Sequence, residues 1–199
     1  MNNSWAAVWP VPWTLVSIQI AWAATFLYFV VSALLTNRIK KRETVSGQVL
    51  DRILLLGGYL LLFSGLPMHG IPNQHFLQPR ASLQIAGAAL TYLGLPLTIW
   101  SRACLGRYWS VVVALKQDHR LIQSGPYSMI RHPLYSGIIL AAIGMTLCVT
   151  TWSSLLGAGL LLVCFERRAL KEDAFLAGEF GAEFEVYRQH TGRLLPRLG

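Results

Sequence analysis

Leu134 to Phe165 read LYSGIILAAIGMTLCVTTWSSLLGAGLLLVCF, an apolar stretch without a single charged residue. The hydrocarbon core of a bilayer is about 30 Å thick, and roughly 20 apolar residues in a helix cross it. The stretch is too long for one straight span and slightly short for two. Its polar middle contains Trp152, which suits the headgroup level. We therefore predict a tight hairpin of two spans, near 134–150 and 151–167, with one long tilted helix as the alternative.

Three further apolar runs precede this stretch and predict spans near 14–35, 48–68 and 81–101. Hydrophobic residues make up 54% of the chain and charged residues 13%, whereas soluble domains carry roughly a quarter charged residues. We predict one all-α membrane domain, residues 1–199, with about five transmembrane helices. The basic cluster Arg38–Arg42 follows the first run, the reverse of the order in a signal peptide, so we expect that run to stay as an anchor.

The basic residues predict the orientation, because cytoplasmic loops are enriched in Lys and Arg. With the N-terminus outside, the inner segments are about 36–52, 102–133 and 167–199, and they hold all of the 17 Lys and Arg residues except Arg80. The net charge of +8 is then explained by membrane topology. This distribution argues against a nucleic-acid partner, since the basic residues flank spans and form no single soluble face.

Patterns typical of metal or nucleotide sites are missing from the sequence. Cys104, Cys148 and Cys164 are isolated and lack metal-ligand spacing. His69 and His75 lie in an outer loop without carboxylates nearby, so we predict no metal site. Neither a Walker motif nor an HExxH or GxSxG motif occurs, and alternating strands and helices for a dinucleotide fold are lacking.

Two inner segments are unusual for a protein built of spans. The connection 102–133 is long and too apolar to be disordered. The tail 167–199 is predicted to begin as an amphipathic helix that continues the last span, is interrupted at Gly181, and ends near Gly192 and Pro196. We expect the two segments to form a cytoplasmic cap that binds a cofactor.

Polar side chains gather at this inner boundary. Pro133 opens a helix, and free backbone N–H groups at a helix start favour an anion such as an amino-acid carboxylate. His132 and Tyr135 lie beside it, where anchoring at the interface is the alternative role. Arg168 and Glu172 share one helix face by their i, i+4 spacing. A guanidinium suits a planar carboxylate, although a solvated ion pair is the alternative.

The motifs of this region resemble a known family. They are Gly125-Pro126-Tyr127, Arg131-His132-Pro133-Leu134-Tyr135, Glu172, Glu179-Phe180-Gly181-Ala182-Glu183-Phe184, Tyr187 and Gly192-Arg193-Leu194-Leu195-Pro196. In order and spacing they look like the isoprenylcysteine carboxyl methyltransferase family over roughly residues 105–199. Residues 1–100 match only as apolar spans, and the length resembles the compact prokaryotic members, which implies a prokaryotic inner membrane.

The resemblance implies a pocket for S-adenosylmethionine and a second opening toward the lipid for an apolar substrate. By position, the family's cofactor contacts fall on His119, Arg120, Leu121, Ile122, Tyr127, His132, Pro133, Leu134, Tyr135 and Glu172. The substrate-orienting arginine of the family falls on Arg168. This chain departs from the family pattern mildly at Asp173, and more strongly at the apolar residues 112–114.

The expected reaction is methyl transfer from S-adenosylmethionine to a lipophilic or prenylated acceptor reached through membrane lipid. A carboxylate acceptor is ionised at neutral pH and needs no general base, so we favour carboxyl O-methylation. A phospholipid amine or a small thiol is the alternative acceptor. A small transporter or an assembly subunit is the non-enzymatic alternative, but charges at span ends suit a boundary site better than a conduit.

Overall fold

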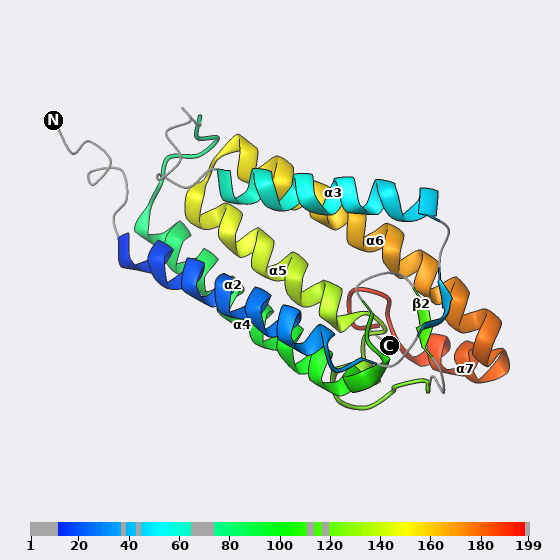
Figure 1. Cartoon of the computed structure of the whole chain (residues 1–199). Helices are drawn as coiled ribbons and strands as arrows, with labels where there is room; N and C mark the ends of the chain where they lie inside the picture. The colour runs from blue at the N-terminus through cyan, green and yellow to red at the C-terminus, as the bar shows by residue number, and fades with distance from the viewer. Residues whose placement is uncertain are drawn as a thin grey trace, which may run out of the picture.

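The computed structural model describes residues 12–36, 39–42, 45–64, 74–110, 114–116 and 120–197. The elements in chain order are α2 (Pro12–Ala33), β1 (Ile39–Arg42), α3 (Val45–Ser64), α4 (Ala81–Leu105), η2 (Gly106–Tyr108), β2 (Ala114–Lys116), η3 (Gly125–Ser128), α5 (Pro133–Val149), α6 (Trp152–Phe180) and α7 (Ala182–His190). The long helices form a bundle in which α4 packs on α2 and α5, while α6 packs on α3 and α5 (Figure 1). Strand β2, helix α7 and the C-terminal segment gather at one end of this bundle (Figure 1).

Three helices in the described part of the chain are long and apolar enough to cross a membrane. These candidate spans are Trp13–Ala33, Gly47–Ser64 and Ala81–Tyr108. Helix α5 is apolar but has only 17 residues, and the apolar start of α6 continues into its charged second half. Large apolar side chains on α2, such as Ile20, Leu27 and Val30, are exposed. The chain is therefore a helical membrane protein.

The last apolar stretch forms two helices joined by a tight turn, so the alternative of one long helix is wrong, while the two membrane crossings stay a prediction. Helix α5 ends where Thr150 adopts a left-handed conformation with φ 52°. Thr151 then caps α6 by accepting a hydrogen bond from the backbone N–H of Ser154. A hydroxyl side chain at this position satisfies one of the free N–H groups of the first turn. The two threonines thus end one helix and start the next.

Small residues allow α4 and α5 to approach closely. A Cβ atom added at Gly94 would lie 2.4 Å from the carbonyl oxygen of Gly137, so a side chain cannot fit without separating the helices. Nearby, the Thr98 hydroxyl donates to the carbonyl oxygen of Gly94 at 3.0 Å, within its own helix. Such small-residue contacts are typical of helix packing in membranes. The close approach fixes the start of α5 against the end of α4.

A buried carboxylate joins α3 to α6. Asp51 on α3 is only 5% exposed, and it pairs with Lys171 at 2.7 Å and with Arg167 at 3.4 Å. Both cations belong to the charged half of α6. The pairing fixes α3 beside the part of α6 that carries Arg168 and Glu172.

The structure adds helix ends to the predicted spans. Helix α4 continues past residue 101, the predicted end of the third span, to Leu105, and η2 follows to Tyr108. The predicted all-α class is confirmed for the described residues, apart from a short antiparallel ladder formed by β1 and β2. The predicted interruption of the tail is correct: α6 ends at Gly181, which has φ 49°, and α7 follows it.

Candidate active site

A pocket lies at the end of the bundle where α4 ends, α5 begins and the charged half of α6 passes by. It is lined by Leu105, Tyr108, Trp109, Ser110, Arg120, Leu121, Ile122, Tyr127, Arg131, His132, Leu134, Tyr135, Glu172, Phe175, Leu176 and Tyr187. The enclosed part measures about 100 Å³, less than the roughly 300–1,000 Å³ of pockets that bury a drug-sized ligand. A ligand as large as a nucleoside derivative must therefore widen this cavity or extend out of it.

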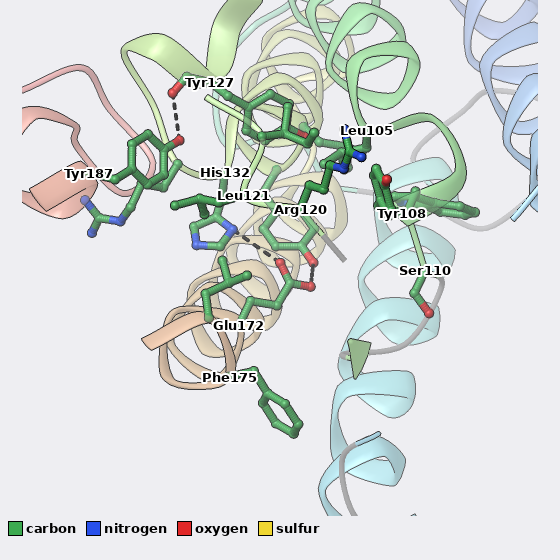
Figure 2. A pocket seen from close by; sticks show the side chains of 16 residues that line it. Leu105, Tyr108, Ser110, Arg120, Leu121, Tyr127, His132, Glu172, Phe175 and Tyr187 are labelled. Atoms are coloured by element: carbon green, nitrogen blue, oxygen red, sulfur yellow. Dashed lines mark hydrogen bonds and ion pairs between the residues drawn. The ribbon is translucent and has the colours of Figure 1, made fainter. Parts of the chain in front are cut away.

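Glu172 receives donors from two residues of the segment that starts α5. The Tyr135 hydroxyl donates to Glu172 Oε1 at 2.5 Å, and His132 Nδ1 lies 3.3 Å from Glu172 Oε2. Figure 2 shows the Glu172 carboxylate pointing toward His132. One carboxylate therefore connects α6 to the start of α5 in the wall of the pocket.

His132 is held on its other side by a second carboxylate. Its Nε2 lies 2.8 Å from Asp173 Oδ1, and the side chain of His132 is 5% exposed. Arg131 also binds Asp173, with its Nη2 at 3.2 Å from Oδ2. The imidazole therefore lies between two carboxylates of neighbouring residues on α6.

These contacts change the acidity of all three groups. Burial by itself would lower the pKa of His132, but hydrogen bonds to Asp173 and Glu172 raise that pKa above its usual value. Burial by itself would raise the pKa of Glu172, but the hydrogen bond and charge of His132 and the charge of Arg168 lower it. The pKa of Asp173 is lowered against burial in the same way, by His132 and Arg131. The cluster thus favours an imidazolium between two ionised carboxylates.

The structure brings together most residues that the family resemblance points to. Of these, Arg120, Leu121, Ile122, Tyr127, His132, Leu134, Tyr135 and Glu172 line the pocket. Pro133 forms the first turn of α5 and is buried outside the lining. His119 lies outside the described residues. The lining supports a shared pocket, while the role of each residue in binding a cofactor stays a prediction.

Arg168 lies beside the pocket wall and is absent from its lining. The residue is 8% exposed, and its guanidinium carbon lies 5.9 Å from the centre of the Tyr135 ring. Tyr135 itself lines the pocket and stacks on His132, with ring centres 5.6 Å apart. A ligand in the pocket would therefore reach Arg168 only past or beside Tyr135.

Several residues of the site are not indicated by the sequence motifs. Phe175 and Leu176 lie three and four residues after Glu172, so helical spacing alone could have placed them on the same face. Trp109 follows η2, and its sequence context carries no signal for a pocket wall. Asp173 was noted only as a departure from the family pattern, although it binds both Arg131 and His132.

The lining residues offer partners for apolar, cationic and anionic groups of a ligand. Trp109, Phe175 and Leu176 offer apolar surface for a purine ring. The carboxylate of Glu172 can accept hydrogen bonds from ribose hydroxyls or an ammonium group, and the guanidinium of Arg120 can pair with a carboxylate. Within the described residues, no group of three or more His, Cys, Asp or Glu side chains is placed to hold a metal ion.

The fold and the pocket define a helical membrane protein whose polar site lies at one end of its bundle. Residues 87–178 match the isoprenylcysteine carboxyl methyltransferase (ICMT) family. The matched part of the chain includes α5 and most of α6. The match contains most of the residues that line the pocket, among them His132, Tyr135 and Glu172.

Curated relatives agree with the family match. The chain is 33% identical over 96 residues to a protein-S-isoprenylcysteine O-methyltransferase of Schizosaccharomyces pombe, covering 47% of this chain and 41% of the relative. It is 34% identical over 94 residues to a probable protein-S-isoprenylcysteine O-methyltransferase of Oryza sativa subsp. indica, covering 46% and 49%. The cobalt-zinc-cadmium resistance protein CzcN of Cupriavidus metallidurans is 35% identical over 104 residues, covering 49% and 46%. The matches thus span less than half the length of these three relatives.

Proposed function

We propose that this chain is a membrane methyltransferase that transfers a methyl group from S-adenosylmethionine to the carboxylate of a lipophilic, isoprenylcysteine-like acceptor. The observation that carries the proposal is the overlap of the family match with the pocket. The matched segment 87–178 includes His132, Tyr135 and Glu172, which contact one another across α5 and α6. Two relatives whose names state this activity support the same reaction.

Bound S-adenosylmethionine supplies an electrophilic methyl group on a sulfonium. The chain's own residues hold the methyl donor and the acceptor in the right relative position. Glu172 offers a fixed carboxylate, because Tyr135 and His132 hold both of its oxygens. Trp109 and Phe175 add apolar surface to the cavity they line, which is less favourable for water than a polar wall. Holding two reactants in line can contribute about 7–11 kcal/mol to such a reaction, so binding and orientation are the main tasks of this site.

The state of His132 favours a carboxylate acceptor. An amine or a thiol must lose a proton before it attacks a methyl group, whereas a carboxylate is already ionised. Among the described residues of the lining, His132 is the side chain that ordinarily titrates nearest neutral pH. Both of its ring nitrogens face carboxylates, so it is poorly placed to accept a proton from a substrate. Arg168 beside Tyr135 is suited to orient an acceptor carboxylate.

Aromatic side chains support an apolar acceptor that arrives from the bilayer. Trp109 in the pocket wall contacts Phe29 of α2, with ring centres 5.3 Å apart. Further along α2, Phe26 contacts Tyr59 of α3 at 5.0 Å between ring centres. An apolar chain lying along these rings would extend from the bundle toward the pocket.

The membrane arrangement proposed here has five spans, with α5 and the apolar start of α6 as the fourth and fifth. The N-terminus lies outside, and the pocket lies on the cytoplasmic side of a prokaryotic inner membrane. Arg102, Arg131 and Arg193 belong to the pocket end of the bundle, as the positive-inside rule requires for a cytoplasmic end. The segments that follow α4 and α6 then form the cytoplasmic cap.

The test is methyl transfer by the purified chain in lipid nanodiscs. Labelled S-adenosylmethionine is offered with an S-prenylated cysteine derivative that has a free carboxylate, and with its primary amide as the matched control. We expect label on the free acid alone, as a base-labile ester. Label on a phospholipid amine or a small thiol would overturn the carboxylate acceptor. Absence of both transfer and S-adenosylhomocysteine binding would overturn the enzyme and leave a transporter or an assembly subunit.

A further inference from the structure

The C-terminal segment, residues 191–195, lies against the start of α5, although it is outside the family match. The backbone N–H of Arg131 donates to the carbonyl oxygen of Gly192 at 2.8 Å. The next N–H, that of His132, donates to the carbonyl oxygen of Arg193 at 3.0 Å. Two successive backbone bonds thus fix the residues that precede Pro133.

The backbone path of the C-terminal segment requires glycine at one position. A Cβ atom added at Gly192 would lie 1.7 Å from the carbonyl oxygen of Leu195, a distance that no side chain tolerates. The Gly192 N–H also donates to the carbonyl oxygen of Met129 at 3.1 Å. The tight turn therefore brings the segment close enough to bind residues 129–132 on both sides of Gly192.

Asp173 joins this backbone clamp to the side chains of the site. Its carboxylate pairs with Arg131 at 3.2 Å, with His132 at 2.8 Å and with Arg193 at 3.4 Å. The side chain of Asp173 is 14% exposed, so solvent screens these pairs only partly. Three cationic groups from two separate segments therefore meet at one carboxylate of α6.

We propose that Asp173 and the C-terminal segment are positioning elements, which hold His132 so that its Nδ1–H donates to Glu172 and fixes that carboxylate in the pocket. The proposal rests on the proposed function in one respect, namely that Glu172 faces a bound cofactor. Asp173 acts through His132 and is absent from the pocket lining, so it has no direct contact with a ligand there.

The charges around His132 explain how Asp173 would act. Glu172 and Asp173 of α6 face the two ring nitrogens, Tyr135 of α5 stacks on the ring, and the cations Arg131 and Arg193 share Asp173. With both carboxylates present, each ring nitrogen carries a proton and donates. If Asp173 lost its charge, His132 would give up a proton more readily. The neutral imidazole would keep its one proton on Nδ1, facing Glu172, but that hydrogen bond would lose the positive charge that strengthens it.

The experiment measures the titration of His132 directly, by NMR of histidine-labelled protein without any ligand. The variants are Asp173→Asn, Asp173→Glu and, as the matched exposed acid, Glu185→Gln. We expect Asp173→Asn to move the His132 midpoint down by at least about one pH unit, since a nearby opposite charge shifts a pKa by roughly 1–3 units. Asp173→Glu should restore most of the shift, and Glu185→Gln should leave the midpoint unchanged.

Arg193→Gln gives a test of opposite sign that does not depend on the fold of the Asp173 variants. Without this cation the negative charge of Asp173 is compensated less, so it stabilises the His132 imidazolium more strongly and the titration midpoint of His132 should rise.

Calorimetry measures the affinity for S-adenosylhomocysteine at one pH above and one pH below the His132 midpoint of Asp173→Asn. Compared with the unmodified chain, Asp173→Asn should lose at least fivefold more affinity at the higher pH than at the lower pH.

Three results separate the outcomes. An unchanged His132 midpoint in Asp173→Asn overturns the positioning role, and so does an unchanged midpoint in Arg193→Gln if Asp173→Asn does not fold. Shifted midpoints without any S-adenosylhomocysteine binding by the unmodified chain overturn the proposed function instead, while the coupling of Asp173 to His132 stands. Shifted midpoints with an equal loss of affinity at both pH values overturn the link from His132 to Glu172.

Discussion

The Tyr187 hydroxyl of α7 donates a hydrogen bond to the backbone carbonyl oxygen of Tyr127, at 2.7 Å (Figure 2). Both residues line the pocket, and Tyr187 is 6% exposed. This bond joins α7 to η3, two elements that meet at the pocket end of the bundle. The last helix of the chain is therefore part of the pocket wall.

Tyr187→Phe should destabilise the chain and weaken cofactor binding. The change leaves the buried carbonyl oxygen of Tyr127 without this donor, which costs about 1–3 kcal/mol. Thermal unfolding in detergent and calorimetry with S-adenosylhomocysteine measure the two effects. Tyr92→Phe is the matched control, because it removes an exposed bond to Ser17 away from the pocket. Equal unfolding temperatures for the two variants would contradict a role of α7 in the wall.

Arg168→Ala and Glu172→Ala should each reduce methyl transfer at least about tenfold, equivalent to roughly 1.4 kcal/mol. The two losses should differ in kind. Glu172→Ala should weaken S-adenosylhomocysteine binding, because this carboxylate lines the pocket. Arg168→Ala should leave that binding nearly intact and lower the turnover of the acceptor. Near-normal turnover in both folded variants would refute these roles, and Glu185→Ala serves as the exposed control.

The unfolding temperature should be highest in a mildly acidic window. The pKa values of Glu172 and Asp173 fall below 4.5 and 3.8 in the folded chain, so their contribution is present above these values and is lost as the pH falls through the lowered ones. The pKa of His132 rises above 6.5, so its contribution is full below 6.5 and is lost as the pH rises through the raised value. This cluster therefore stabilises the fold most between about pH 4.5 and 6.5.

Thermal unfolding across a pH series checks this window. His132→Gln should remove the alkaline part of the decline, because no imidazolium is left to lose its proton. A decline of the same size in this variant would assign the pH dependence to other groups.

Gly94→Ala should separate α4 from α5 and destabilise the chain by about 1–3 kcal/mol, the usual cost of overpacking a tight contact. The matched substitution is Gly159→Ala on α6, where an added Cβ would meet nothing within 4 Å. That variant should be neutral or slightly more stable, since alanine is favoured over glycine in a helix. If Gly94→Ala were as stable as Gly159→Ala, the close approach of α4 and α5 would be wrong.

The helical framework could be predicted well because its signals are local. The break near Thr150 and Thr151 follows from polar residues in an apolar run, and the break at Gly181 follows from one glycine in a helical pattern. The end of α4 does not follow from the span pattern, because Arg102 marks the edge of the apolar run while the helix continues to Leu105. In the structure Arg102 is 3% exposed and donates to the carbonyl oxygen of Ser32 at 2.7 Å, so the helix continues past it.

The contents of the pocket were predictable in part, through motifs. His132, Tyr135 and Glu172 stand in a recognisable pattern, whereas the partners of Asp173 depend on how α6 is rotated and on where residues 191–195 return. Both are long-range properties, since Asp173 binds residues that lie about 20 and 40 positions away. Contacts between residues so far apart in the sequence cannot be predicted from composition or from the spacing of motifs.

The ladder of β1 and β2 ties the two halves of the chain together outside the bundle. Ile39, Lys41 and Arg42 pair with residues 114–116, which lie in the sequence between Ser110 and Arg120 of the pocket lining. The segment between α2 and α3 is thus paired with a strand that lies, in the sequence, between two lining residues. A change at the chain between these two lining residues can therefore reach the segment between α2 and α3 through backbone pairing, without passing through the helix bundle.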